Sequence, residues 1–255
     1  MEDSKGISAK NNLYNVYKHN ALKRGLKFDL SKAKFYLLTK SNCFYCGSSP
    51  SRVHNHQDNG YVYHYTYNGI DRLDNNIGYS DKNCVSCCFH CNKAKWTLSL
   101  EDFCNYINLV YSHMSGYDLS NQYKLIEFVE DSKGDSARGS LMTFYKQNAK
   151  KKGLDFFLSK KAFYKLTKQN CSYCGIPPNK VHKMHYYKKQ LRYYTYNGVD
   201  RINSDKGYYE ENCVPCCFQC NKAKWTLSTN EFIKYIYNVY DHMLEFGFFD
   251  ASKIV

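Results

Sequence analysis

Residues 67–95 read YNGIDRLDNNIGYSDKNCVSCCFHCNKAK, and a close copy of this stretch occupies residues 196–224. Over the slightly longer segments 65–99 and 194–228, about 24 of 35 positions are identical, which indicates an internal duplication. Each copy is preceded by the pattern CxxCG, at residues 43–47 and 171–175. Two close cysteine pairs separated by a few dozen polar residues are typical of a tetrahedral zinc site, because each pair directs two thiolates at one point. The sequence therefore predicts two zinc modules.

The composition indicates a basic protein. Its 255 residues include thirteen cysteines and carry a formal net charge of +13 with a pI near 9.0, which favours a polyanionic partner such as nucleic acid. No apolar segment follows Met1, so we expect no signal peptide, and no run approaches the ~18 apolar residues of a membrane span. We therefore expect a soluble intracellular protein with reduced, metal-bound thiols and no membrane partner.

The duplication extends beyond the cysteines. Apolar residues recur at helical spacing within residues 9–24, and Ser31 is a candidate N-cap for a second helix. The second copy repeats both features at residues 141–152 and at Ser159, so the repeating unit has about 110 residues. The predicted domains are a first module at residues 1–117, an acidic linker at 118–136 and a second module at 137–255.

Local signals predict the order of elements between the cysteine pairs. The polar stretches at residues 48–60 and 176–190 differ between the copies and are expected to be loops. The tyrosine-rich residues 61–72 alternate as in a strand, and Asn68 with Gly69 is a tight-turn signal in or beside a hairpin.

Helices are predicted to close each copy. Residues 88–95 are expected to form a short helix ending near Trp96. Capping boxes then pair Ser99 with Asp102 and, in the second copy, Ser228 with Glu231. The apolar stripe of the helix that follows each box is expected to be core.

The combined pattern resembles a known family. CxYCG, then GIDRLDNNIGYSDKN, then CCFHCNKAK is similar to the zinc-supported HNH endonucleases, including the PacI-type restriction enzymes and their phage and viral relatives. The likeness covers roughly residues 10–105 and 138–233. It implies an α+β chain of two tandem ββα-metal zinc modules of the treble-clef-like HNH type, each flanked by helices. It also implies metal-dependent hydrolysis of DNA phosphodiester bonds.

The resemblance assigns two kinds of metal ligand. It implies structural zinc ions held by Cys43, Cys46, Cys88 and Cys91 and, in the second copy, by Cys171, Cys174, Cys217 and Cys220. It implies a catalytic Mg²⁺ or Mn²⁺ held by Asp71 and Asn92 and, in the second copy, by Asp200 and Asn221. One carboxylate and one amide oxygen leave most positions of an octahedral ion open for water and phosphate. Asn83 and Asn212 match the middle asparagine of the motif, an orienting residue, and a turn cap explains them equally well.

The sequence departs from the usual motif directly after the aspartate. Most HNH enzymes have a histidine there as general base, whereas this chain has Arg72 and Arg201. Arginine stays protonated and cannot accept a proton from water, but it can bind the scissile phosphate. The candidates for the missing base that occur in both copies are Tyr45 with Tyr173, Tyr79 with Tyr208, and His54 with His182; a metal-bound hydroxide is an equal alternative.

The run CxxCCxxC leaves a second choice of zinc ligands open. Cys84 and Cys87, or Cys213 and Cys216, have the same spacing as the pairs that we favour. The favoured pairs come directly before Asn92 and Asn221, as they do in the family, and we then expect the other thiols to be buried apolar groups.

Two functions from different classes fit this pattern. The first is an HNH-class DNA endonuclease whose two modules act as a monomeric pseudo-dimer; the second is a degenerate zinc module that binds DNA or RNA without cutting. A RING or LIM type of interaction module fits less well, because those interleave two zinc ions in one module. In the endonuclease, Asp71→Ala or Asp200→Ala alone is expected to leave zinc and fold intact and to produce a nicking enzyme. The basic residues expected to contact nucleic acid are Lys18, Lys23, Arg24, Lys146 and Lys152.

Overall fold

The computed structural model describes residues 4–116, 136–185 and 190–249. In these residues the protein has mixed α and β structure, with helices flanking four two-stranded antiparallel sheets. The described residues fall into two compact units, one within residues 1–106 and 238–255 and the other within residues 107–237. The predicted linker at 118–136 lies outside the described residues except for Ser136, and the predicted domain boundaries stay a prediction.

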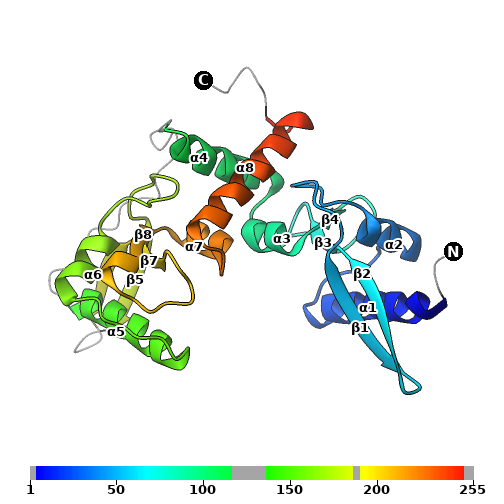
Figure 1. The fold of residues 1–255 in the computed structure, drawn as a ribbon, viewed down its shortest axis with the longest axis horizontal. Helices are drawn as coiled ribbons and strands as arrows, with labels where there is room; N and C mark the ends of the chain where they lie inside the picture. The colour runs from blue at the N-terminus through cyan, green and yellow to red at the C-terminus, as the bar shows by residue number, and fades with distance from the viewer. Residues whose placement is uncertain (1–3, 117–135, 186–189, 250–255) are drawn as a thin grey trace. The chain divides into compact units, whose positions relative to one another are not determined.

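The same order of helices and strands occurs in both copies (Figure 1). In the first copy the elements are α1 (Ser4–Lys23), α2 (Lys32–Lys40), β1 (Arg52–Asp58), β2 (Tyr61–Tyr67), β3 (Gly69–Arg72), β4 (Cys84–Cys87), α3 (Phe89–Lys95) and α4 (Leu100–Met114). In the second copy they are α5 (Ser136–Lys151), α6 (Lys160–Thr167), β5 (Lys180–His185), β6 (Leu191–Tyr196), β7 (Gly198–Arg201), β8 (Cys213–Cys216), α7 (Phe218–Lys224) and α8 (Thr229–Glu245), with the 3₁₀ turn η3 (Glu210–Asn212) before β8.

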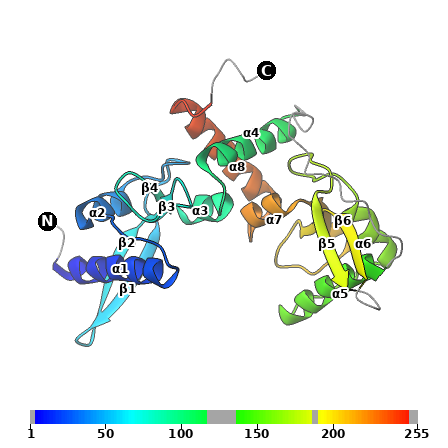
Figure 2. The same ribbon diagram turned by 180° about the vertical axis from the view of Figure 1, so that it is seen from behind.

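Each copy has a core between its first two helices and its long hairpin. Helix α1 packs against β1 and β2, and Figure 2 shows the equivalent packing of α5 beside β5 and β6. The first core contains Ala9, Leu13, Ala21, Leu30, Phe35, Leu38, Tyr65, Tyr67, Ile70, Tyr79 and Cys84. Tyr17 of α1 also reaches β3, because its hydroxyl accepts a hydrogen bond of 3.3 Å from the backbone N–H of Ile70. The core therefore fixes the strand that carries Asp71.

The long hairpin corrects two predictions. The stretches at residues 48–60 and 176–190 are not loops throughout, since they contain β1 and β5. The turn lies at Asn59 and Gly60, whose φ angles of 49° and 80° are typical of a two-residue hairpin turn. Asn68 is instead completely buried between β2 and β3, where its Nδ2 donates to the carbonyls of Ser41 and Ser48. The strand was missed because most side chains of β1 are exposed and polar, so no hydrophobic alternation marks it.

The predicted helix caps are confirmed. The Ser31 hydroxyl accepts a hydrogen bond from the backbone N–H of Lys34, and the Ser159 hydroxyl accepts one from Ala162. The backbone N–H of Asp102 donates to the Ser99 hydroxyl at 3.0 Å, and the Ser228 hydroxyl donates to Glu231 at 2.8 Å. The core stripes on the helices that follow are buried at Phe103, Ile107, Val110, Phe232, Ile236, Val239 and Met243.

A short sheet and one helix position the candidate site. Strands β3 and β4 are antiparallel, with Asp71 opposite Val85, and α3 begins directly after β4. The loop between the strands is held by backbone pairing, because Tyr79 N donates to Lys27 O at 2.8 Å and Asp29 N donates to Tyr79 O at 2.7 Å. Gly78 is required at this crossing, since a Cβ there would lie 2.2 Å from Lys27 O. Strands β7 and β8 repeat the arrangement.

Candidate functional site

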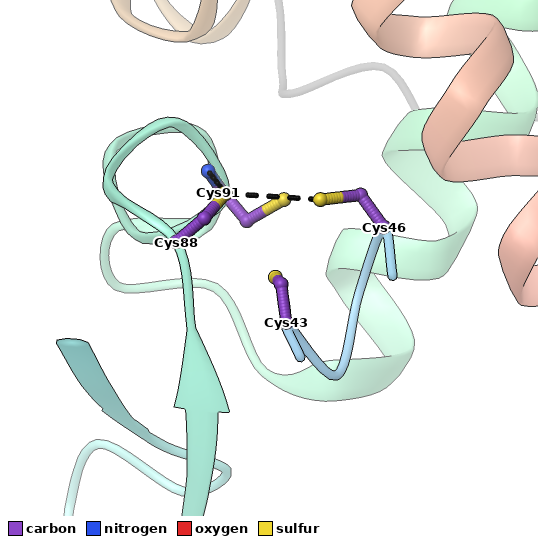
Figure 3. A group of neighbouring side chains, drawn as sticks. All are labelled: Cys43, Cys46, Cys88 and Cys91. Carbon is purple, nitrogen blue, oxygen red and sulfur yellow. Dashed lines mark hydrogen bonds between the residues drawn. The ribbon is translucent and has the colours of Figure 1, made fainter. Parts of the chain in front are cut away.

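Four cysteine sulfurs come together in each copy. They belong to Cys43, Cys46, Cys88 and Cys91 (Figure 3), and in the second copy to Cys171, Cys174, Cys217 and Cys220; within each group the sulfurs lie within 4.8 Å of one another. A tetrahedron with Zn–S bonds of about 2.3 Å has sulfur–sulfur edges of about 3.8 Å, close to the 3.7 Å between Cys46 Sγ and Cys88 Sγ. The same 3.7 Å separates Cys174 and Cys217. Either group could therefore hold a zinc ion.

A turn and the start of a helix orient these thiols. The Cys43 carbonyl accepts a hydrogen bond from Gly47 N at 2.9 Å, closing the first knuckle, and Gly47 has a φ of 68° that favours glycine. Cys88 is the N-cap of α3, and its sulfur accepts from Cys91 N at 3.4 Å. The second knuckle is thus the first turn of a helix whose later residues face β3.

The remaining cysteines lie outside these groups. Cys84 and Cys87 belong to β4 and are buried, as Cys213 and Cys216 are in β8. Burial raises the pKa of Cys84 to about 11, so this thiol is neutral at ordinary pH. Cys104 is buried on α4, and burial raises its pKa to about 11 as well.

The carboxylate of Asp71 is buried and takes two contacts on one oxygen. The Tyr45 hydroxyl donates to Asp71 Oδ2 at 2.7 Å, and the Lys95 ammonium lies 3.0 Å from the same oxygen. The Lys95 side chain is completely buried, and its Nζ also donates to the carbonyl of Arg72 at 2.9 Å. These contacts do not involve the other carboxylate oxygen, Asp71 Oδ1.

The second copy has the same arrangement. Tyr173 donates to Asp200 Oδ2 at 2.8 Å, and Lys224 lies 3.1 Å from that oxygen and 2.9 Å from Arg201 O. Burial raises the pKa of Asp200, and the charge of Lys224 and the hydroxyl of Tyr173 oppose that effect. The buried lysine therefore favours the ionised carboxylate.

Arg72 and Arg201 brace the loop that follows the aspartate. Arg72 Nη1 donates to Asn75 O at 2.8 Å and to Ile77 O at 2.7 Å, and its guanidinium lies 5.3 Å from the centre of the Tyr79 ring. Arg201 makes the equivalent contacts to the carbonyls of Ser204 and Lys206. One nitrogen of each guanidinium is thus used within the loop.

Asn83 and Asn212 join the two ends of the same loops. Asn83 Nδ2 donates to the carbonyls of Asp74 and Gly78, both at 3.0 Å, and its Oδ1 accepts from Asp74 N at 3.0 Å. Asn212 bonds in the same way to Asn203 and to Gly207. Either asparagine is a turn-stitching residue in this geometry.

Asn92 and Asn221 lie next to the aspartates. Asn92 is exposed on α3 one turn before Lys95, so both residues face β3, and Asn92 Nδ2 lies 3.4 Å from Ile70 O. Asn221 makes the same contact to Val199 O at 3.4 Å. A carboxylate and an amide side chain therefore meet at the junction of the short sheet and the helix.

None of the proposed side-chain bases has the geometry of a base beside Asp71. Burial, followed by the charge of Asp71, raises the pKa of Tyr45 far above its usual range, so its hydroxyl donates and keeps its proton. Tyr79 accepts a hydrogen bond from Arg24 Nη2 at 3.0 Å. His54 lies in the long hairpin with Nε2 2.9 Å from Asn12 Oδ1, and burial lowers its pKa. The equivalent residues of the second copy behave in the same way, since burial raises the pKa of Tyr173 and lowers that of His182.

The predicted nucleic-acid contacts are all exposed. Lys18, Lys23 and Lys146 lie in the last two turns of α1 and α5. Arg24 and Lys152 come directly after these helices. Sequence reasoning missed Lys95 and Lys224, although both copies contain the repeated NKAK. The signal was the spacing, since a lysine three residues after a helical asparagine shares its face.

Comparisons with known proteins give few relatives. No protein-family model matches the chain. The uncharacterized protein R423 of Acanthamoeba polyphaga mimivirus is 34% identical over 211 residues, which are 83% of this chain and 33% of the relative. The chain thus spans about a third of the length of that relative.

A solved structure of the rare-cutting HNH restriction endonuclease PacI is also similar. It matches at 25% identity and a TM-score of 0.32, over 49% of this chain and 94% of that one. A TM-score this low does not establish a shared fold. Among the described helices, none is long and apolar enough to cross a membrane.

Proposed function

We propose that the chain is a metal-dependent DNA endonuclease of the HNH class, with two tandem ββα-metal zinc modules and one catalytic site in each. The observation that carries this is the recurrence in both copies of an aspartate and an asparagine at the junction of a short hairpin and a helix that begins at a cysteine knuckle. The sequence motif and the basic charge support the same function.

The residues fit the metals that this function requires. The cysteine groups have the donor set and spacing of a structural Zn²⁺ site. Asp71 and Asn92, with Asp200 and Asn221, would hold a catalytic Mg²⁺ or Mn²⁺ through oxygen atoms, which are the ligands such ions prefer. When bound, a divalent ion of this kind acidifies water and offsets charge on a phosphoryl group.

The surrounding side chains have distinct roles in this proposal. Tyr45 and Lys95 orient the carboxylate of Asp71 through Oδ2 and leave Oδ1 for the ion. Arg72 and Asn83 hold the loop after β3 in one conformation, so that the site is preorganised. Since none of the candidate bases in the described residues has the geometry to take a proton beside Asp71, a bound divalent ion would have to acidify the water.

Two sites in one chain would serve the two strands of a duplex. Cutting both strands requires two sites, which many nucleases obtain by dimerisation. The proposal is therefore that each copy cuts one strand and that the monomer acts as a pseudo-dimer.

The test uses Asn92, which is exposed, and Asn221, which is half-buried, because substitutions there should spare the fold. Asn92→Ala and Asn221→Ala each remove one metal ligand and only a long contact to a carbonyl, so we expect changes in stability within about 0.5 kcal/mol. Supercoiled plasmid with Mg²⁺ or Mn²⁺ should become linear with the wild type, open-circular with either single variant, and stay supercoiled with the double variant. Linear product from a single variant at the wild-type rate would refute the division of labour, and an inactive wild type would refute the endonuclease.

One observation favours a second candidate function. Lys95 already neutralises Asp71, which gives this carboxylate a structural reason to exist without any catalytic metal. The second candidate is a zinc module that binds DNA or RNA without cutting. It predicts that the chain binds nucleic acid but does not cleave it with either Mg²⁺ or Mn²⁺. On duplex DNA, the slope of log K against log salt concentration should fall by about 0.9 for each lysine contact removed. Variants of Lys18, Lys23, Lys146 and Lys152 measure that slope.

A further inference from the structure

Lys95 and Lys224 occupy unusual positions for lysine. Both side chains are completely buried, whereas lysine is almost never fully buried unless it is paired. Each pairs with the aspartate of its own copy, at 3.0 Å and 3.1 Å, and each also donates to the carbonyl of the following arginine at 2.9 Å. The ammonium groups are therefore fixed beside the candidate metal ligands.

This pairing changes the charge that a divalent ion would meet. A Mg²⁺ site usually combines one or two carboxylates with substrate phosphates and retained water. Here the single carboxylate is compensated by Lys95, and Asn92 contributes no charge. Arg72 adds a further positive charge on the next residue of β3. A zinc ion on four thiolates would leave a net negative charge in the same unit, but that charge is the same with and without substrate.

We propose that Lys95 and Lys224 act as internal counter-ions to Asp71 and Asp200, so that the divalent ion binds more tightly when a nucleic-acid phosphate is present. This inference rests on the proposed function. The phosphate supplies the negative charge that the compensated carboxylate lacks. Lys95 does not contact the phosphate, because it is completely buried; it positions the carboxylate and weakens the capture of free metal. DNA binding thus promotes capture of the catalytic ion.

The first arm of the test measures Mn²⁺ binding to the zinc-loaded wild-type chain by electron paramagnetic resonance. The probes are Mn²⁺ alone and Mn²⁺ with sonicated duplex DNA. The blank for binding to DNA itself is an Asp71→Asn/Asp200→Asn protein with the same DNA. We expect Mn²⁺ to bind the wild type about ten-fold more tightly with DNA than without, within the ordinary range of coupling between two ligands. Equal affinity with and without DNA overturns the inference.

The second arm removes the counter-ions. Lys95→Gln with Lys224→Gln deletes the charge and retains an amide donor toward the carbonyls of Arg72 and Arg201. We expect DNA-free Mn²⁺ binding to tighten about ten-fold and the effect of DNA to shrink by the same factor, because the carboxylates then no longer need the phosphate to supply negative charge. Unchanged DNA-free affinity in a folded, zinc-loaded variant overturns the inference, and if the variant does not fold the first arm decides alone.

The blank separates this inference from the proposed function. If the Asp→Asn protein with DNA binds Mn²⁺ as tightly as the wild type, the aspartates are not metal ligands and the proposed site itself is wrong. If the Asp→Asn protein loses Mn²⁺ but the wild type binds it equally with and without DNA, the metal site stands and only the role of the lysines fails.

Discussion

Removing Lys95 alone from its buried pair with Asp71 should strongly destabilise the first unit. At their separation of 3.0 Å and an effective dielectric constant of about 20, the attraction between the charges is about 5.5 kcal/mol. Removing one partner of a buried pair typically costs about 3–5 kcal/mol, because the other charge is left without compensation. We therefore expect Lys95→Met to lower the free energy of unfolding by about 4 kcal/mol.

The two substitutions should be strongly coupled. Asp71→Asn keeps an oxygen that accepts from Tyr45 and Lys95, so its cost should be smaller than that of Lys95→Met. The double variant has no unpaired charge and should lie within about 2 kcal/mol of the wild type, which corresponds to a coupling of several kcal/mol. This result would also correct the expectation that Asp71→Ala leaves the fold intact, because alanine provides no partner for Lys95.

The assay is chemical denaturation at saturating zinc, with circular dichroism as the readout of unfolding. Lys82→Met is the matched control, since Lys82 is exposed in the loop before β4 and its loss should change stability by less than about 0.5 kcal/mol. Lys224→Met repeats the experiment within the same chain, at a pair 3.1 Å apart. If Lys95→Met costs less than about 1 kcal/mol, or if the double variant is as unstable as the sum of the singles, the reasoning about a buried, mutually compensating pair is wrong.

Three further results are expected. The loaded chain should contain two zinc ions and unfold on strong chelation, because a core of this size depends on its metal; a zinc content of one or four per chain would contradict the ligand groups. Gly78→Ala should destabilise by about 1–3 kcal/mol, because its Cβ would meet Lys27 O at 2.2 Å, whereas Gly6→Ala in helix α1 has open space and should be neutral or stabilising in the same melting experiment. Burial raises the pKa of Cys104 to about 11 in the folded chain, whereas the thiol of the unfolded chain ionises near 9.0. Between about pH 9 and about pH 11 the unfolded state therefore binds fewer protons, so the free energy of unfolding should fall as pH rises through this range. Cys104→Ile, which copies Ile233 of the second repeat, should flatten that fall, and an unchanged slope would show that Cys104 does not contribute to it.

The sequence by itself determined the features that depend on neighbours along the chain. Capping at Ser31 and Ser99 was predictable because a cap is satisfied by residues two or three positions away. The buried stripes of α4 and α8 followed from a period that any helix imposes. The spacing of the cysteine pairs likewise indicated two metal sites, because the two thiols of a pair are only three positions apart.

Tertiary structure decided what depends on residues far apart in sequence. It made β1 a strand, because pairing with β2 and packing against α1 give order to a polar segment that has no periodic signal. It buried Lys95 against Asp71, which lies 24 positions earlier in the sequence. It also placed the Arg72 side chain where it donates hydrogen bonds to carbonyls of the loop. Burial and charge compensation are properties of the whole unit. The spacing from Asn92 puts Lys95 on one face of α3, but only the position of β3 decides that this face is buried.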